Sequence, residues 1–282
     1  MGSHRIIFVH GIGIGENVRS YDQLWNGATE AWNELHPGHD FRARFDRVDV
    51  HWDDAMAEAQ VDLFKAAFPN LTWRGASSGW ASNLTHPIEF LRTLVTAYVG
   101  DAVGYSSEAD NKIRRRFWDM AGPAMTDGVP WTLVGHSLGS CIGFDFLFDL
   151  FDPQRGLRIF EPIEATPAVA AKARAGFRGF VSFGSPIGLF MLRRAADLHV
   201  PGAPQPWSKI RNPVPEGIPW VNCWDKQDII AYPLEGLFGH CQGTSKVKDV
   251  CVDTGDLIIN SHIRYWRNRD VARELVLALP QP

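Results

Sequence analysis

Residues 130–151 read PWTLVGHSLGSCIGFDFLFDLF, and they carry the clearest indication of how the chain folds. The run from Pro130 to Val134 is typical of a buried strand. The residues from Leu138 to Phe151 have helical periodicity, and the Asp152-Pro153 pair that follows ends a helix. Between strand and helix lies Gly135-His136-Ser137-Leu138-Gly139, which matches the pattern G-x-S-x-G. Strand, tight turn and helix therefore follow one another directly, with a serine at the turn.

The G-x-S-x-G pattern is typical of a nucleophile elbow, in which a serine sits on a sharp strand-to-helix turn with its hydroxyl exposed. Such a turn forces Ser137 into strained backbone geometry, and side chains at Gly135 or Gly139 would collide with the neighbouring strand and helix. The pentapeptide alone is common, so its flanks carry the prediction. The alternative is a glycine-rich turn with an idle serine.

Strand-like runs alternate with helical patterns along most of the chain, which predicts an α/β fold with a mainly parallel sheet covered by helices. A crossover helix is expected after the first strand, because Ser20 begins a capping box and helical spacing continues to Leu35. Another helical pattern runs from Ile263 to Leu279. At least six strands are expected, with candidates at 5–9, 41–52, 131–134, 177–183, 220–224 and 247–252.

Residues 53–127 break this rhythm, because they contain helical patterns and no convincing strand. We expect a helical insertion or cap here, within a single domain that spans residues 1–282. The aromatic segment around Trp73 and Trp80 favours a lid over an apolar pocket, and ordinary packing helices with a surface loop are the alternative. Residues 200–219 are rich in proline and glycine and predict a long surface loop.

Composition excludes several classes of protein. The 282-residue chain has 28 basic and 32 acidic side chains and a net charge of −4, so it lacks the electrostatic footprint of a nucleic-acid binder. No apolar run approaches the ~20 residues that span a bilayer, and no secretory signal is evident, so a cytoplasmic protein is expected. Four cysteines without a CxxC pair predict reduced thiols and no zinc site, with a Cys241–Cys251 bridge as the alternative.

A serine at its ordinary pKa is a poor nucleophile, so it needs a general base and an acid that orients the base. In this architecture the acid and then the histidine follow the serine, which restricts the base to His199, His240 or His262. His262 is favoured because it follows the last candidate strand and precedes a helical pattern, where a loop can reach Ser137. His240 is the reserve candidate, and a merely structural His262 is the alternative.

The orienting acid is expected after the strand at 220–224, which opens into Asp225-Lys226-Gln227-Asp228. Asp225 and Asp228 both fit. Asp228 is favoured because the tip of the loop leaves more freedom to aim a carboxylate at the histidine. Asp253 and Asp256 are further candidates.

The oxyanion that forms on attack needs preorganised N–H donors. The amide of Leu138, directly after the serine, supplies one. The amide of Ile12 is the candidate for the second, because it follows the first strand within His10-Gly11-Ile12-Gly13. The glycines of this segment also suggest a phosphate cradle, but the G-x-G-x-G spacing and the absence of a P-loop lysine disfavour it.

The combination of VHGIG at 9–13, GHSLG at 135–139 and an acid followed by a histidine resembles the α/β-hydrolase superfamily, in its serine lipase and esterase branch. FGSP at 183–186 and DIIAYPL at 228–234 likewise resemble segments of lipases and of intracellular phospholipase-like members. The resemblance implies an α/β-hydrolase fold and no metal or organic cofactor. It also implies the site, with a triad of Ser137, Asp228 and His262 and with Ile12 and Leu138 as oxyanion donors.

The expected function is hydrolysis of carboxylic esters through an acyl-enzyme, on a small-molecule or lipid ester. Thioesterases, amidases and acyltransferases use the same serine chemistry, and the sequence does not separate them. A catalytically inactive hydrolase-fold binding protein is the alternative of another class. No nucleic-acid partner and no integral membrane segment are expected. Transient contact with a lipid surface is compatible with the sequence, which leaves the oligomeric state open.

Overall fold

The computed structural model of the chain describes residues 2–11, 17–52, 112–151, 167–191, 211–239, 241–255 and 258–282. Within these residues six strands form one sheet, and every neighbouring pair is parallel. The order across the sheet is β2-β1-β3-β4-β5-β6. The strands are β1 (His4–Val9), β2 (Phe45–Val50), β3 (Trp131–His136), β4 (Phe177–Phe183), β5 (Trp220–Trp224) and β6 (Val247–Cys251).

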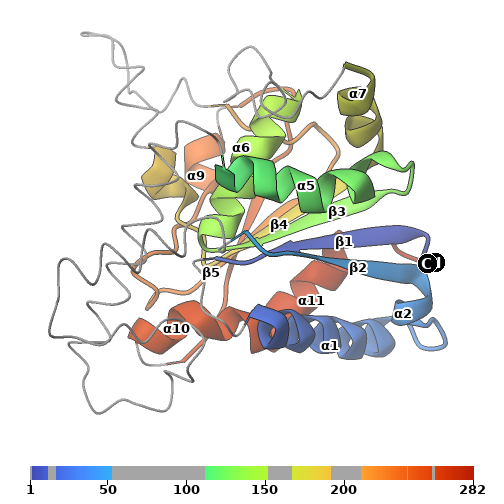
Figure 1. The fold of residues 1–282 in the computed structure, drawn as a ribbon. Coiled ribbons are helices and arrows are strands. Elements are labelled where there is room, and N and C mark those ends of the chain that lie inside the picture. Colours follow the sequence, from blue (N-terminus) through green and yellow to red (C-terminus); the bar gives the residue numbers. More distant parts are fainter. Residues whose placement is uncertain are drawn as a thin grey trace, which may run out of the picture.

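Helices cover both faces of this sheet (Figure 1). One face carries α1 (Asn17–Leu35) and α11 (Arg269–Ala278), which pack against each other, together with the 3₁₀ helix η4 (Tyr265–Arg267). The other face carries α5 (Lys112–Thr126), α6 (Leu138–Phe151), α7 (Pro167–Gly176) and α9 (Glu235–Phe238). The short helix α2 (Phe41–Arg44) precedes β2, and α10 (Ile258–Arg264) leads into η4. The predicted α/β class, with a parallel sheet covered by helices on both faces, is confirmed.

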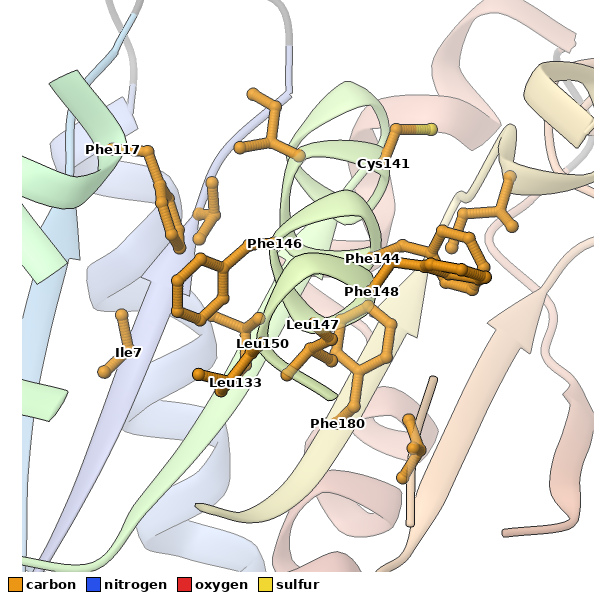
Figure 2. Close-up of a cluster of buried hydrophobic side chains, with 14 of the residues drawn as sticks. Ile7, Phe117, Leu133, Cys141, Phe144, Phe146, Leu147, Phe148, Leu150 and Phe180 are labelled. Carbon is orange, nitrogen blue, oxygen red and sulfur yellow. The ribbon is translucent and has the colours of Figure 1, made fainter. Parts of the chain in front are cut away.

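Helix α6 is the best buried helix on its face, because every residue from Leu138 to Leu150 is buried. Its side chains point in several directions at once (Figure 2). Phe146 meets Phe117 of α5 with ring centroids 5.1 Å apart, while Phe144 packs 5.7 Å from the ring of Trp220 in β5. A helix that is apolar on all sides belongs in a core. This packing fixes the position of the turn from which α6 begins.

The order of the strands places a topological switch point between β1 and β3. The chain leaves β1 for β2 on one side and continues from β3 to β6 on the other. In open α/β sheets, ligands bind where the strand order reverses, outside the carboxyl ends of the strands. Val9 pairs with Gly135 in this register, so Gly11 and Ser137 follow these two strands side by side.

Some element boundaries differ from the sequence-based predictions. The strand predicted over 41–52 is wrong for its first four residues, which form α2, because the side chain of Asp40 accepts the N–H groups of Arg42 and Ala43 as an N-cap. Helix α1 begins at Asn17, so Ser20 is not its N-cap. The pattern from 263 to 279 is interrupted at Asn268, which ends η4 and caps α11.

Other predictions fall partly outside the described residues. Of the predicted insertion, residues 53–111 lie outside them, and α5 at its end is helical, as expected. Of the predicted loop over 200–219, only 211–219 is described, where Pro215 bridges to Thr244. The single-domain boundary and the lid remain predictions. All four cysteines are free. Among the described helices, none is both long and apolar enough to cross a bilayer.

Candidate active site

The serine of the G-x-S-x-G sequence occupies the turn between β3 and α6. Ser137 has a φ of 51° and is the one non-glycine residue with positive φ among those that the structure describes. This left-handed conformation costs about 1–2 kcal/mol for an L-residue, so surrounding contacts must hold it. The backbone N–H of Ser137 donates to the carbonyl oxygen of Phe183 at 3.1 Å. The turn is therefore strained as predicted, and it is tied to the neighbouring strand.

The two glycines of the elbow are required by space. A Cβ at Gly139 would overlap the carbonyl oxygens of Val9 and His10 at the end of β1. A Cβ at Gly135 would lie 2.6 Å from the Cα of Ser140 in the first turn of α6. Both obstacles are backbone, which cannot move aside cheaply. Alanine at either position would therefore push the helix away from the sheet.

His262 on α10 connects the serine to an aspartate. Its Nε2 lies 2.8 Å from Oγ of Ser137, and its Nδ1 lies 2.8 Å from Oδ2 of Asp228. A carboxylate only accepts hydrogen bonds, so Nδ1 carries the proton and donates to Asp228. Nε2 then holds a lone pair and accepts the hydroxyl proton of Ser137. The three side chains form one directed chain of hydrogen bonds.

The three side chains that these hydrogen bonds connect are buried, since Ser137, Asp228 and His262 are only 2%, 3% and 7% exposed. Burial raises the pKa of Asp228, but the positive charge of a protonated His262 and the hydrogen bonds that the carboxylate accepts lower the pKa by more than burial raises it. One of these bonds comes from the N–H of Ile230 at 3.0 Å. The net result is a pKa below the ordinary value, so Asp228 is a carboxylate at neutral pH.

Asp225, the other aspartate of the same loop, has a different environment. Its Oδ2 accepts the N–H and the hydroxyl of Thr254 at 2.5 and 2.7 Å, and its own N–H donates to the hydroxyl of Tyr265 at 2.8 Å. Asp225 therefore ties the β5 loop to the segment after β6 and to η4. Of the further candidates for the acid, Asp253 is exposed and accepts the N–H of Gly255, and residue 256 lies outside the described residues.

Of the two expected oxyanion donors, Leu138 is described, and it lies at the switch point. Leu138 begins α6, and the first N–H groups of a helix have no acceptor within the helix. Ile12 lies outside the described residues, but Gly11 just before it is described. A Cβ at Gly11 would lie only 2.5 Å from Cβ and 3.1 Å from Oγ of Ser137. Gly11 therefore lies directly beside the side chain of Ser137.

The sequence patterns do not single out His136, the second residue of the G-x-S-x-G turn. Its ring is buried and lies 4.9 Å from the ring of His262. Its Nε2 is 2.8 Å from the carbonyl oxygen of His262. The signal in the sequence is a polar side chain at a position that the elbow buries. The reserve base His240 and also His199 lie outside the described residues.

Another reactive group, the thiol of Cys141, lies in the helix that follows the turn. Cys141 begins the second turn of α6, where burial raises the pKa of its thiol well above the usual range. Such a thiol is a weak nucleophile because the thiolate is the reactive form. In the part of the chain that the structure describes, no three His, Cys, Asp or Glu side chains gather as a metal site would require.

No protein-family model matches the chain, and no curated protein matches it. Among solved structures, a presumed hydrolase of the α/β superfamily from Xanthomonas campestris pv. campestris is 14% identical, with a TM-score of 0.37, 98% of this chain covered and 99% of the other. The esterase domain of a Rhodothermus marinus protein is 12% identical (TM-score 0.36, 98% and 85% covered). A metagenome-derived lipolytic enzyme is 13% identical (TM-score 0.36, 98% and 93% covered).

Proposed function

We propose that the protein is a serine hydrolase that cleaves carboxylic esters, with Ser137 as nucleophile, His262 as general base and Asp228 as the orienting acid. The observation that carries this proposal is the unbroken chain of two 2.8 Å hydrogen bonds from Ser137 through His262 to Asp228. Nucleophile, base and orienting acid within hydrogen-bond reach are the signature of covalent catalysis by serine. The left-handed backbone at Ser137 adds support, because strained geometry of this kind clusters at functional sites.

In the first half-reaction, Oγ of Ser137 attacks the ester carbonyl carbon while Nε2 of His262 takes the hydroxyl proton. The tetrahedral intermediate collapses as the C–O bond to the alcohol breaks, and His262 returns the proton to the leaving oxygen. The acyl group remains as an ester on Ser137. Asp228 holds the imidazole in the required tautomer and stabilises its positive charge while the proton resides there.

In the second half-reaction, water attacks the acyl-enzyme and His262 takes its proton as before. Collapse of the second intermediate releases the carboxylic acid and restores the serine hydroxyl. The oxyanion of both intermediates is placed against the amide of Leu138, at the positive end of α6. The amide of Ile12 is the proposed second donor, and the proximity of Gly11 to Ser137 supports that location.

The direct test is hydrolysis of a nitrophenyl ester by the purified protein and by Ser137→Ala. We expect the variant to lose at least about 10³-fold in kcat, because the nucleophile is gone. Ser245→Ala is the matched control. Ser245 precedes β6 and lies at the amino ends of the strands, whereas Ser137 follows the carboxyl end of β3, so this variant should leave kcat unchanged. Hydrolysis by a folded Ser137→Ala protein at the wild-type rate would contradict the proposal.

The class of ester is addressed by a series of substrates with acyl chains of increasing length, assayed with and without detergent micelles. Thioesters and anilides with the same acyl groups belong in the series, because the same chemistry serves them. We expect esters to have the highest kcat/KM and each activity to disappear in Ser137→Ala. A higher kcat/KM for the matched thioester or anilide would reassign the substrate class while retaining the nucleophile.

A further inference from the structure

His136 is the last residue of β3 and directly precedes the proposed nucleophile. Its side chain is 6% exposed, and aromatic rings surround it. The ring of Phe183 stacks on it with centroids 5.2 Å apart, and Trp266 meets it edge-on at 5.4 Å. A buried imidazole needs a partner for each of its two nitrogens.

Both nitrogens of His136 have a partner. Nδ1 lies 3.2 Å from the indole nitrogen of Trp266, which can only donate, so Nδ1 accepts. Nε2 lies 2.8 Å from the carbonyl oxygen of His262, which can only accept, so Nε2 carries the proton and donates. The two bonds together select one neutral tautomer of the ring. A second proton on His136 would point at the Trp266 N–H and break the arrangement.

These bonds attach the elbow to the segment that carries His262. Ser137 contacts the imidazole of His262, while His136 contacts the main-chain carbonyl of the same residue and the side chain of Trp266 four residues later. Two consecutive residues of the elbow thus contact His262, one at its side chain and the other at its main chain. The imidazole is fixed relative to the nucleophile through its side chain and through its backbone.

The neighbouring strand leaves room for this contact. Gly184, directly after β4, has a φ of 56°, and a Cβ there would lie 3.1 Å from Nε2 of His136 and 3.0 Å from the ring of Tyr265. A larger residue at 184 would press on the nitrogen that donates to His262. Burial and the charge of His262 lower the pKa of His136 to about 3, so the ring stays neutral across the neutral pH range.

We propose that His136 is a positioning residue for the reaction, which sets the distance between His262 and Ser137 by holding the backbone of His262. This inference rests on the proposed function of the triad. His136 touches neither the substrate carbonyl nor the serine hydroxyl in this role. Its effect should therefore appear in the rate of the chemical step and not in substrate binding.

The test compares His136→Leu with His136→Gln in the full-length protein. Leucine has a similar volume and no polar atom, whereas glutamine retains an N–H donor near the position of Nε2. We expect His136→Leu to reduce kcat roughly 100-fold with KM within about 3-fold, because a displacement of about 1 Å is enough for such a loss. Glutamine should recover at least about 10-fold of that loss.

Ser182→Ala is the matched control for the loss of a buried polar group. The hydroxyl of Ser182 donates to Asn222 and accepts from the indole of Trp220, so it also has one donated and one accepted bond, and both partners lie outside the proposed triad. It should reduce the melting temperature without changing kcat. A folded His136→Leu protein with wild-type kcat, or one that glutamine fails to improve, would overturn the inference.

Labelling of Ser137 by a fluorophosphonate gives a second readout that needs no substrate. The rate of labelling should fall with kcat in His136→Leu, and Ser137→Ala should not be labelled. If wild type is labelled at Ser137 and His136→Leu is labelled equally fast, the role of His136 fails while the proposed function stands. If His136→Leu does not fold, Trp266→Phe removes one of the two bonds. It should slow labelling several-fold, and an unchanged rate would overturn the inference.

Discussion

Replacing Gly11 with alanine tests the geometry beside the nucleophile in one methyl group. Its Cβ would lie 2.5 Å from Cβ of Ser137. Non-bonded carbon atoms lie ~3.5–4.0 Å apart at their best separation, so the two atoms must move apart by about 1 Å. The hydrogen bond from the Ser137 N–H to Phe183 restrains the serine, so the strain spreads over both segments. Overpacking of this kind costs about 1–3 kcal/mol of folding free energy.

We expect Gly11→Ala to reduce kcat/KM for a nitrophenyl ester about 100-fold, because a misplacement near 1 Å removes the alignment on which serine attack depends. Gly236→Ala is the control, since a Cβ at Gly236 in α9 meets nothing within 4 Å. Circular dichroism and thermal melting establish that both variants are folded. A folded Gly11→Ala protein with wild-type kcat/KM would contradict the placement of Gly11 against the reacting serine.

Three further predictions concern charge and burial. Asp228→Asn should lower kcat for ester hydrolysis roughly 10³- to 10⁴-fold, because the amide favours the wrong imidazole tautomer. Asp225→Asn should mainly lower the melting temperature. If Asp225→Asn instead lost kcat and Asp228→Asn only lost stability, the two roles would be exchanged. Burial and two nearby arginines lower the pKa of His4 from 6.5 to about 4, so the unfolded chain binds this proton first and stability falls as the pH drops. Between pH 7 and pH 5, the free energy of unfolding measured with urea should therefore fall by about 2 kcal/mol less in His4→Gln than in wild type. An equal fall in both proteins would be inconsistent with the buried neutral ring. A thiol reagent should modify exposed Cys251 in the folded protein and reach Cys141 only after unfolding, and rapid modification of native Cys141 would contradict its burial.

The strands of the sheet were predictable because parallel strands at the centre of an α/β fold are buried on both faces. The candidates at 177–183 and 220–224 coincide with β4 and β5. The start of the second strand was not predictable from its periodicity, because the cap at Asp40 outweighs the local pattern over 41–44. Single polar side chains decide such boundaries, and apolar periodicity carries no record of them.

In the candidate site, too, some residues could be predicted from the local sequence and others depend on contacts between distant segments. The G-x-S-x-G pattern indicated Ser137 because only glycine fits at positions 135 and 139, where the backbone of β1 and of α6 lies too close for a Cβ. The distinction between Asp225 and Asp228 depends on contacts with Thr254 and His262, which lie far away in the sequence. The position of His136 against the backbone of His262 is equally non-local. Spacing predicts which residues reach the edge of the sheet, but only the packing of the segment after β6 pairs them.

The assignment of Ser137 as nucleophile is tested most simply by identifying the residue that a fluorophosphonate modifies. Intact mass and peptide mapping should find a single adduct, on Ser137, and the adduct should be absent from Ser137→Ala. His262→Ala should slow its formation by at least about 10³-fold, because the serine loses its base. An adduct on another residue, or equal labelling of wild type and Ser137→Ala, would contradict the assignment of Ser137 as the nucleophile.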